Sequence, residues 1–488
     1  MDRRNNLLQS VKLTASTRTY STSNSEVKNE LSALENFTFL FRDAPCFKVN
    51  GSQVQVISSP VDFYGTLKDK VSCAQKRITF ASLYLGTGQL EQELVDCVHE
   101  RVQSNSQLKV NILLDYSRGS RGKINSRTML LPLLASSKDT ARVALYHTPV
   151  LRGFLKWLMP ERYNETIGLQ HMKIYLVDDT VIISGANLSH DYFTNRQDRY
   201  IMIRDCPLLA DFYNQLVDTV SEFSFQLNSG DELTLHPNWP IHPYKHSKAL
   251  FVQRAHQKIK SSYDSYKKNV RETFETSEAG DTWMFPLLQM GQLGIYVDSQ
   301  VTKALLQSAP YGSHIKLASG YFNLTQDYMD TILGSEATFD ILMAHPTANG
   351  FLGAKGFAGA IPAAYTQLAF EFFQRLRYLL VSHRIKLMEY RRNMWTFHAK
   401  GLWLYLNSGL PILTLIGSPN FGYRSVYRDL ESQLAIVTLN PSLRSQLHNE
   451  QVDLWSRSEG VIAETFLQTD RVVPLWVKIV IRVIKKFF

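Results

Sequence analysis

The 488-residue sequence has few cysteines and no long uninterrupted apolar run. The four cysteines form no Cys-x-x-Cys pair, so neither a zinc site nor a disulfide framework is expected. No stretch of about twenty uncharged apolar residues is present, so no membrane-spanning helix is expected. Hydrophobic residues make up 44% of the chain, which is enough for a sizeable core. The cysteines are Cys46, Cys73, Cys97 and Cys206.

Acidic residues are nearly missing from the start of the chain, where only Asp2 precedes Glu26. The same stretch is rich in serine and threonine and carries several basic residues. This composition is typical of a mitochondrial transit peptide, so residues 1–30 are expected to be such a peptide or a disordered basic tail. The net charge of the whole chain is +9, which either favours polyanionic partners or only keeps the protein soluble.

Short β-branched runs alternate with helical patterns along the chain, which predicts an α/β fold. The pattern occurs twice, and this repeat predicts two tandem units, 31–228 and 282–474, separated by a linker or covering helix at 229–281. The matching segments are 78–94 and 315–333, 110–118 and 339–347, 143–147 and 385–390, 170–179 and 397–406, and 181–193 and 413–425.

Each unit contains His-x-Lys on a polar strand, followed by a tight turn that ends in asparagine. Alternation along a strand places each histidine and lysine on one side. A lone copy would be an ordinary strand pair, but two copies facing each other about a pseudo-twofold axis would form one cleft. The residues are His171, Lys173, Ser184 and Asn187 in the first unit, and His398, Lys400, Ser418 and Asn420 in the second.

This set of side chains suits phosphoryl chemistry. Lysine and asparagine are donors that fit a tetrahedral anion such as a phosphodiester. Two histidines supply complementary roles near neutral pH, because one can attack phosphorus while the other protonates the leaving oxygen. The lysines neutralise the non-bridging oxygens, so no metal is required.

The two copies resemble the signature of the phospholipase D superfamily, His-x-Lys-x4-Asp followed by Gly-Ser-x-Asn. The first copy has Asp178 in the aspartate position, and the second has Tyr405 there. The turn is a swapped Ser-Gly-Ala-Asn in the first unit and a matching Gly-Ser-Pro-Asn in the second. The resemblance implies two tandem phospholipase D-like α/β sandwich units that share an active-site cleft.

The resemblance also implies roles for individual residues. It assigns His171 as the nucleophile and His398 as the general acid and base. The carboxylate that orients a histidine falls on Glu431 in the second unit. In the first unit Gln197 occupies that place, with Asp198 adjacent. Asp178 and the two lysines complete the expected catalytic set, and the turn residues Asn187, Ser418 and Asn420 are expected to bind phosphate.

From about residue 35 onward the chain resembles the phosphatidyltransferases of this superfamily that make phosphatidylglycerophosphate. Segments such as "SLYLGTGQLEQELVDC", "YFTNRQDRY" and "TFHAKGLWLYL" carry the likeness. It implies transfer of a phosphatidyl group from CDP-diacylglycerol to glycerol 3-phosphate, with no cofactor and no nucleic-acid partner. The alternatives are a phosphodiesterase or nuclease that uses the same histidines, or a catalytically inactive membrane-binding scaffold.

The acceptor in such a reaction carries its own phosphate, which needs a cationic contact. Residues 115–127 follow a predicted strand and include Arg118 and Arg121, with Lys123 and Arg127 beyond them. We expect Arg118 and Arg121 to bind phosphate, although a solvated basic loop explains the same residues equally well.

A diacyl substrate also requires contact with a membrane. Residues 475–488 combine four basic residues with Trp476 and a terminal Phe487-Phe488 pair, which predicts a helix lying in an anionic interface. An ordinary packed C-terminal helix is the alternative. The segments 150–163 and 349–365 are further places for lipid contact. Together with the transit-like start, these features predict a peripheral protein of the mitochondrial inner membrane.

Overall fold

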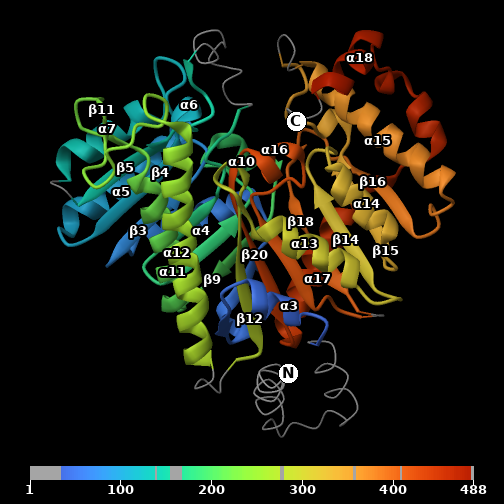
Figure 1. Cartoon of the computed structure of the whole chain (residues 1–488), viewed down its shortest axis with the longest axis horizontal. Helices are drawn as coiled ribbons and strands as arrows, with labels where there is room; N and C mark the ends of the chain where they lie inside the picture. The colour runs from blue at the N-terminus through green and yellow to red at the C-terminus, as the bar shows by residue number, and fades with distance from the viewer. Residues whose placement is uncertain are drawn as a thin grey trace, which may run out of the picture.

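The computed structural model describes residues 35–137, 140–153, 167–274, 280–354, 359–406 and 409–484. The predicted transit peptide at 1–30 therefore lies outside the described residues. Two large sheets form the body of the protein, with helices packed around them (Figure 1). Elements of the first unit lie on the left of that view, and elements of the second lie on the right.

The first sheet has nine strands in the order β11-β10-β5-β4-β3-β6-β7-β9-β2. Most of its central strands are buried along their whole length, because helices or the other unit cover both faces. Its strands are β2 (Val54–Ile57), β3 (Arg77–Ala81), β4 (Lys109–Asp115), β5 (Ala141–Tyr146), β6 (Ile174–Val177), β7 (Thr180–Ser184), β9 (Tyr200–Ile203), β10 (Phe225–Leu227) and β11 (Leu233–Leu235).

The second sheet has ten strands in the order β1-β12-β20-β19-β18-β14-β15-β16-β21, with β13 paired to β12. A separate two-stranded sheet pairs β8 (Arg196–Gln197) with β17 (Thr396–Phe397) across the two units. The strands of the second sheet are β1 (Phe47–Val49), β12 (Thr282–Met290), β13 (Ile295–Tyr296), β14 (His314–Ser319), β15 (Thr338–Ala344), β16 (Ile385–Tyr390), β18 (Lys400–Tyr405), β19 (Leu413–Gly417), β20 (Leu430–Thr438) and β21 (Ser458–Gly460).

The two sheets repeat one topology. The order β10-β5-β4-β3-β6-β7-β9-β2 in the first corresponds to β21-β16-β15-β14-β18-β19-β20-β12 in the second. In each, three neighbouring strands are parallel, and the strand that follows His-x-Lys joins them antiparallel. The predicted α/β fold with two tandem units is thus confirmed.

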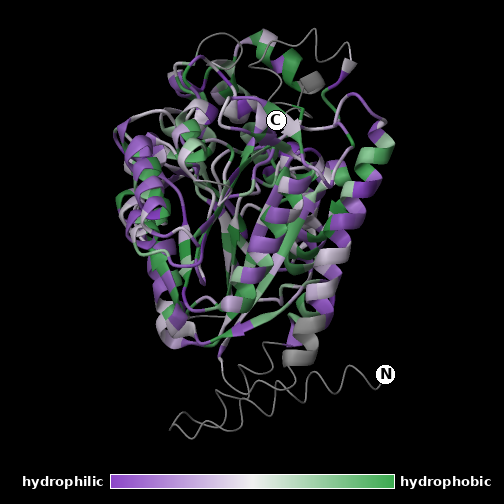
Figure 2. Cartoon of the chain, turned by 90° about the vertical axis from the view of Figure 1, so that its left-hand side faces the viewer, coloured by the Kyte–Doolittle hydropathy of each residue, from purple (hydrophilic) through white to green (hydrophobic). Residues whose placement is uncertain are grey.

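Helices cover the sheets, and hydrophobic and hydrophilic residues alternate along them, as expected for helices that pack on one side (Figure 2). The first unit contains α4 (Pro60–Ser72), α5 (Gln89–Ser104), α6 (Tyr116–Gly119), α7 (Ser126–Ser136), α10 (His190–Thr194) and α11 (Pro207–Glu222). The rest of the chain contains α3 (Thr38–Asp43), α12 (Lys248–Phe274), α13 (Val297–Ser308), α14 (Gln326–Gly334), α15 (Ile361–Tyr378), α16 (Tyr423–Tyr427), α17 (Pro441–Trp455) and α18 (Leu475–Ile484).

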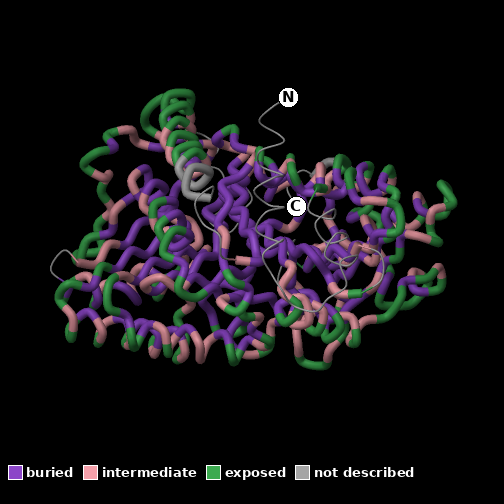
Figure 3. The backbone as a smooth tube through the Cα atoms, turned by 90° about the horizontal axis from the view of Figure 1, so that it is seen from below, coloured by how far each residue is buried: buried purple, intermediate pink, exposed green. Residues whose placement is uncertain are grey.

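Three large apolar clusters hold these layers together, and buried residues fill the interior while exposed ones lie at the periphery (Figure 3). One cluster lies between the first sheet and helices α4, α5 and α7, and a second lies between the second sheet and helices α3, α13, α14 and α15. The third joins residues from both sheets with α11, α12 and α17. Because this central cluster draws on residues of both units, it joins them in one close-packed core.

Arg199, just before β9, contacts the second unit next to the central cluster. Its side chain is 1% exposed and forms an ion pair with Glu450 of α17 at 2.9 Å. It also donates to the Leu415 carbonyl at 2.7 Å and lies 3.7 Å from the centre of the Trp403 ring. A buried charge held by this many partners is costly to disturb, so the contact fixes how the units meet.

The first described elements of the chain pack on the second unit rather than on the first. Strand β1 pairs antiparallel with β12 of the second sheet. Phe41 of α3 lies edge-on to Phe285 of β12, with ring centres 4.9 Å apart. The first elements of the expected first unit, α3 and β1, therefore lie with the second unit, because the chain crosses to the first sheet only at β2. The expected linker contains α12, which packs on α11 as a covering helix.

None of the helices in the described ranges combines the length and the apolar character that a bilayer crossing requires.

Candidate active site

Each histidine-bearing segment pairs with the other unit. The His398 amide donates to the Gln197 carbonyl at 2.8 Å, next to the parallel pairing of β17 with β8. In the same way, the His171 amide donates to the Leu430 carbonyl at 2.8 Å. These matched contacts bring the two His-x-Lys copies together from separate halves of the chain, as the repeat predicts.

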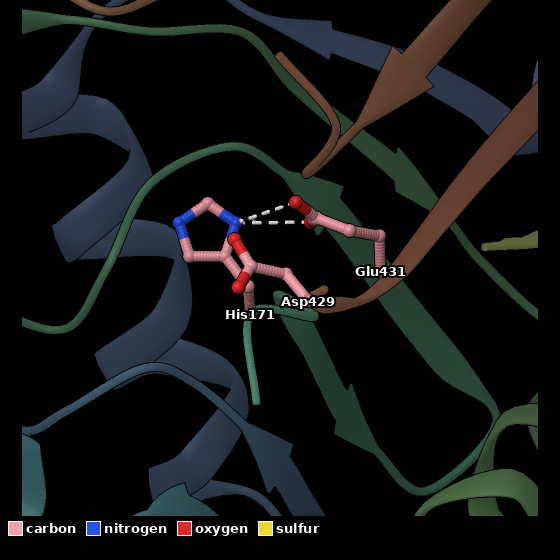
Figure 4. Close-up of side chains that lie close together, drawn as sticks. All are labelled: His171, Asp429 and Glu431. Carbon is pink, nitrogen blue, oxygen red and sulfur yellow. Dashed lines mark hydrogen bonds and ion pairs between the residues drawn. The ribbon is translucent and has the colours of Figure 1, made fainter. Parts of the chain in front are cut away.

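His171 is oriented by a carboxylate from the second unit. Its Nδ1 atom lies 3.0 and 2.9 Å from the two carboxylate oxygens of Glu431, which is fully buried on β20 (Figure 4). The Ser425 hydroxyl donates to the same carboxylate at 2.8 Å. Because Nδ1 is engaged, Nε2 is the ring nitrogen left for chemistry.

His398 is oriented by a carboxylate from the first unit. Its Nδ1 atom lies 2.6 Å from Asp198 Oδ2, and the Asp198 side chain is 1% exposed. The Tyr192 hydroxyl of α10 lies 3.2 Å from His398 Nε2. Each unit therefore supplies the histidine for one half of the site and the carboxylate for the other.

Asp198 was missing from the expected catalytic set, in which Gln197 was placed opposite Glu431. The Gln197 side chain instead donates to the Asp198 carbonyl at 3.0 Å. A signal in the sequence could have found the aspartate: Asp198 follows Asn187 by the same number of residues as Glu431 follows Asn420.

The two lysines are also in the site. Lys173 and Lys400 are each 1% exposed, and each Nζ donates to the carbonyl of the histidine two residues earlier, at 2.6 and 2.7 Å. Lys400 Nζ also lies 3.8 Å from Asp198 Oδ2. Two buried lysines therefore lie near two buried carboxylates, and burial lowers the pKa of Lys173 well below its ordinary value.

The turn residues close the cleft. The side-chain amide oxygens of Asn187 and Asn420 are buried and have no hydrogen-bond partner among the described residues. The Ser418 hydroxyl instead contacts both the amide and the carbonyl of Ser432, at 3.1 and 3.3 Å, so it holds the turn. At Gly185 a Cβ atom would lie 2.7 Å from Asp198 Oδ1 and 3.1 Å from Lys400 Nζ, which explains glycine at this swapped position.

Asp178 lies away from this cleft, contrary to its expected catalytic role. It follows β6 in the left-handed region, with φ of 52°, and its carboxylate accepts from the backbone amides of Gln75, Lys76 and Arg77. These contacts hold the turn before β3. In the second unit, the Tyr405 hydroxyl contacts Gln451 of α17 at 3.0 Å. Both residues of this motif position are therefore structural.

The expected phosphate-binding arginines lie in and after α6. The Arg118 guanidinium lies 4.4 Å from the centre of the Tyr84 ring, and the Tyr84 hydroxyl contacts Ser189 at 3.1 Å. Arg118 thus reaches the side of the site formed by the first turn. Arg121 is half-buried in the loop that follows α6. Arg127 is paired with Asp231 on the surface.

Burial dominates the protonation of the site. It lowers the pKa of both His171 and His398 well below the ordinary value, and the neighbouring lysines act in the same direction. Burial also lowers the pKa of Lys400 to about 8. It raises the pKa of Asp198 to about 6, against the opposing charge of Lys400. The imidazoles are therefore neutral near pH 7, as a nucleophile must be.

One imidazole and two carboxylates, those of His171, Asp429 and Glu431, lie close enough to one another to hold a cation (Figure 4). Their atoms already have protein partners. Asp429 accepts from the Leu169 amide at 3.0 Å and pairs with Arg424 at 3.2 Å, and Glu431 contacts His171. Metal-free chemistry stays a prediction.

Two histidines, each fixed by a carboxylate from the other half of a duplicated α/β fold, form the arrangement that the resemblance to the phospholipase D superfamily implies. A solved structure with the same architecture is phosphatidylserine synthase from Haemophilus influenzae Rd KW20. It matches with a TM-score of 0.69 and 20% identity, over 93% of this chain and 99% of the other. No family model matches the chain.

Curated relatives specify the family. The human protein named "CDP-diacylglycerol--glycerol-3-phosphate 3-phosphatidyltransferase, mitochondrial" is 50% identical, over 93% of this chain and 86% of its own length. The Saccharomyces cerevisiae protein with the same enzyme name is 35% identical, over 90% of this chain and 89% of its own length. The chain belongs to the CDP-diacylglycerol–glycerol-3-phosphate 3-phosphatidyltransferase family.

Proposed function

We propose that this enzyme transfers a phosphatidyl group from CDP-diacylglycerol to glycerol 3-phosphate through a covalent phosphatidyl-histidine at His171. The observation that carries the proposal is the paired fixation of the His171 and His398 rings through Nδ1, while His398 Nε2 lies 3.2 Å from the Tyr192 hydroxyl and 3.1 Å from Lys400 Nζ. The products are phosphatidylglycerophosphate, on the route to phosphatidylglycerol and cardiolipin, and CMP.

In the first step, His171 Nε2 attacks the phosphorus that carries the diacylglycerol. The bond between that phosphorus and the CMP oxygen breaks, and His398 gives its proton to the leaving oxygen. Burial disfavours a charged His398 in the free enzyme. The negative charge of the bound diphosphate opposes this effect, so substrate binding itself favours the protonated general acid.

In the second step, neutral His398 takes the proton from the primary hydroxyl of glycerol 3-phosphate. The hydroxyl oxygen attacks phosphorus, the phosphorus–nitrogen bond breaks, and His171 is regenerated. Lys173 and Lys400 neutralise the non-bridging oxygens in both steps, and the amides of Asn187 and Asn420 supply further polar contacts. Water competes with the acceptor here, so the nearly complete burial of the histidines favours transfer over hydrolysis.

The basic loop after β4 adds positive charge beside this cleft. The contact of Arg118 with Tyr84 supports the prediction that Arg118 and Arg121 bind phosphate at the rim. The charge and length of these side chains suit attraction of an anionic substrate.

The C-terminal helix α18 is the proposed membrane contact. Val477 and Ile481 are buried against Ala364 of α15, which precedes Tyr365 in the chain. Leu475 and Ile479 are 73% and 60% exposed. Lys485, Lys486 and the final Phe487-Phe488 pair lie outside the described residues, and the segment 154–166 does as well. A helix docked on one side with bulky apolar residues on the other fits insertion into an anionic lipid interface.

This helix packs on α15, and α15 in turn reaches the surroundings of His398. Tyr365 of α15 stacks on Tyr321 with ring centres 5.2 Å apart, and Tyr321 lies edge-on to the His398 ring at 5.8 Å. Lipid contact at α18 would thus bring the cleft to the membrane that holds the substrate. Relatives named as mitochondrial support a mitochondrial location, and a cardiolipin precursor enzyme fits the inner membrane.

Trapping the intermediate tests the mechanism. The enzyme would be incubated with CDP-diacylglycerol without acceptor, quenched at alkaline pH to preserve a phosphorus–nitrogen bond, and digested for mass spectrometry. We expect a phosphatidyl adduct on His171 that disappears after addition of glycerol 3-phosphate and is missing in His171→Ala. An adduct on His398 would reverse the assignment, and release of CMP without any dependence on glycerol 3-phosphate would indicate a hydrolase.

Liposome binding tests the membrane contact. Replacing Trp476 and Ile479 by serine should weaken binding to anionic vesicles, because both side chains are exposed on α18. Tyr311→Ser is the matched control, since Tyr311 is 85% exposed on a loop outside α18. Equal binding by all three proteins would reject α18 as the contact.

A further inference from the structure

The paired segments around β8 and β17 make two side-chain contacts, and only one of them is explained by the chemistry above. The register pairs Arg196 with Thr396, and Arg196 Nε donates to the Thr396 hydroxyl at 2.9 Å. Two residues along each chain, Asp198 contacts His398. The Tyr192 side chain connects the two contacts, because the Arg196 guanidinium lies 4.7 Å from its ring centre and His398 Nε2 lies 3.2 Å from its hydroxyl.

The surroundings of Arg196 resemble an anion-binding site. Its side chain is 15% exposed and lies 4.7 Å from the centre of the Tyr192 ring, whose hydroxyl contacts His398. At Gly350 a Cβ atom would lie 3.2 Å from Arg196 Nη2 and 3.5 Å from the Tyr321 hydroxyl, so glycine keeps space beside both groups. The counter-ion of Arg196 is Asp191 at 2.9 Å, which is 54% exposed and therefore weakly held.

The equivalent place near the other histidine has the opposite charge. Asp429 precedes Glu431 by two residues, as Arg196 precedes Asp198. Asp429 raises the pKa of His171, whereas Arg196 lowers that of His398, although burial outweighs both effects. Each of these groups has a counter-ion, Arg424 for Asp429 and Asp191 for Arg196, so the two places differ in the sign of their more buried charge.

The cation near His398 suits the acceptor of the second step, which carries a phosphate. The acceptor hydroxyl must reach His398 Nε2, and its phosphate sits at the other end of a three-carbon chain. Two residues along a strand cover about 6.6 Å, a distance that the five bonds from hydroxyl oxygen to phosphorus can span. We propose that the Arg196 guanidinium, with the space kept by Gly350, binds the phosphate of glycerol 3-phosphate and selects it over neutral acceptors.

This proposal rests on the roles of His171 and His398 given above, and the test separates the two. Full-length enzyme with Arg196→Gln would be assayed in mixed micelles with CDP-diacylglycerol and either glycerol 3-phosphate or glycerol. Loss of a charge-assisted fork should lower kcat/KM for glycerol 3-phosphate by about 10- to 100-fold, mainly through KM, with a much smaller effect on glycerol. Arg196→Lys should recover only part of the loss, because an ammonium lacks the planar fork.

The first half-reaction is followed separately, as exchange of labelled CMP into CDP-diacylglycerol without acceptor. Arg196→Gln should reduce exchange at least tenfold less than it reduces transfer. Asp191→Asn should act in the opposite direction and lower KM for glycerol 3-phosphate several-fold, because the phosphate no longer competes with that carboxylate. A misfolded variant could not produce this improvement.

Three results would overturn the subsite. Exchange and transfer could fall in parallel in Arg196→Gln, the preference for glycerol 3-phosphate over glycerol could stay unchanged, or Arg118→Gln rather than Arg196→Gln could abolish that preference. An unchanged preference together with a phosphatidyl adduct on His171 would refute the subsite and leave the histidine mechanism intact. Absence of the adduct would refute the mechanism itself.

Discussion

Replacement of Asp198 by asparagine tests the reciprocal arrangement of the site most directly. The change removes the charge that faces His398 Nδ1 at 2.6 Å and Lys400 Nζ at 3.8 Å, in a side chain that is 1% exposed. Asparagine has nearly the same shape, so packing around Gly185 is preserved. Its amide nitrogen can donate to Nδ1, which favours the wrong tautomer of His398.

The expected loss is large because the carboxylate both orients the imidazole and stabilises its charged form. Removal of the equivalent aspartate in a Ser-His-Asp triad, a worked example of tautomer loss, lowers kcat by about 10⁴-fold. Here Lys400 is left without its partner as well, so we expect a fall of about 10³- to 10⁴-fold in kcat/KM.

The assay is CMP release that depends on glycerol 3-phosphate, measured from pH 5 to 9. Burial raises the pKa of Asp198 to about 6, so wild-type kcat/KM should fall as pH drops below about 6, where the carboxylate gains a proton. The residual activity of Asp198→Asn should lack this acid limb. Gln197→Ala is the matched control, because the Gln197 contact to His398 is made by its backbone.

Two outcomes would refute the reasoning. Activity of Asp198→Asn within tenfold of wild type would mean that His398 does not need this carboxylate. A larger loss in Gln197→Ala than in Asp198→Asn would restore Gln197 to the position opposite Glu431.

Further predictions concern neighbouring positions. Gly185→Ala should reduce kcat at least tenfold with little change in KM, because its Cβ would displace the Asp198 carboxylate, and steady-state kinetics at fixed pH would detect this. Activity should fall as pH rises through about 8, where Lys400 loses its charge in the folded enzyme. Between pH 8 and 10.5 the unfolded chain binds more protons at this lysine than the folded enzyme does, so its contribution to the free energy of unfolding rises with pH. The melting temperature and the rate should therefore change in opposite directions over this range. Asp178→Asn should cost about 1–3 kcal/mol of unfolding free energy in urea while kcat of the folded enzyme changes only a few-fold, because its partners are backbone amides far from the cleft. Gly401→Ala should destabilise by at least about 2 kcal/mol in the same titration, since φ is +115° and a Cβ would meet the Leu415 carbonyl at 2.0 Å; a midpoint equal to wild type would contradict the close contact.

The duplicated fold and the two His-x-Lys pairs could be predicted because the repeat leaves a local pattern in the sequence. His171 with Lys173 and His398 with Lys400 keep the spacing of two that places them on one face of a strand. The sequence separation between Lys173 and Asp178 is an odd number of residues. Strand alternation therefore argued against placing Asp178 on the same face as His171 and Lys173. The motif position outweighed this geometric signal in the prediction.

Features that depend on contacts between distant segments were not predictable in the same way. The crossing of β1 to the second sheet depends on its pairing with β12, and nothing local to Phe47–Val49 specifies that partner. Asp198 became identifiable only when the turn asparagines, rather than neighbouring residues, were used to align the units. Arg196 gave no motif, because its importance comes from the register of β8 with β17.

Each unit supplies the carboxylate that orients the histidine of the other, and this arrangement constrains how the protein can evolve. Under the proposed mechanism, a substitution at Glu431 should disable His171 and one at Asp198 should disable His398, so damage in one unit is expressed in the other. Neither unit can decay into a passive support or be inherited as a working fragment. Two separately expressed units should be inactive apart and active only when they reassociate. Each copy would thus be indispensable to its sister, even though the exchanged carboxylates themselves differ, as Asp198 and Glu431.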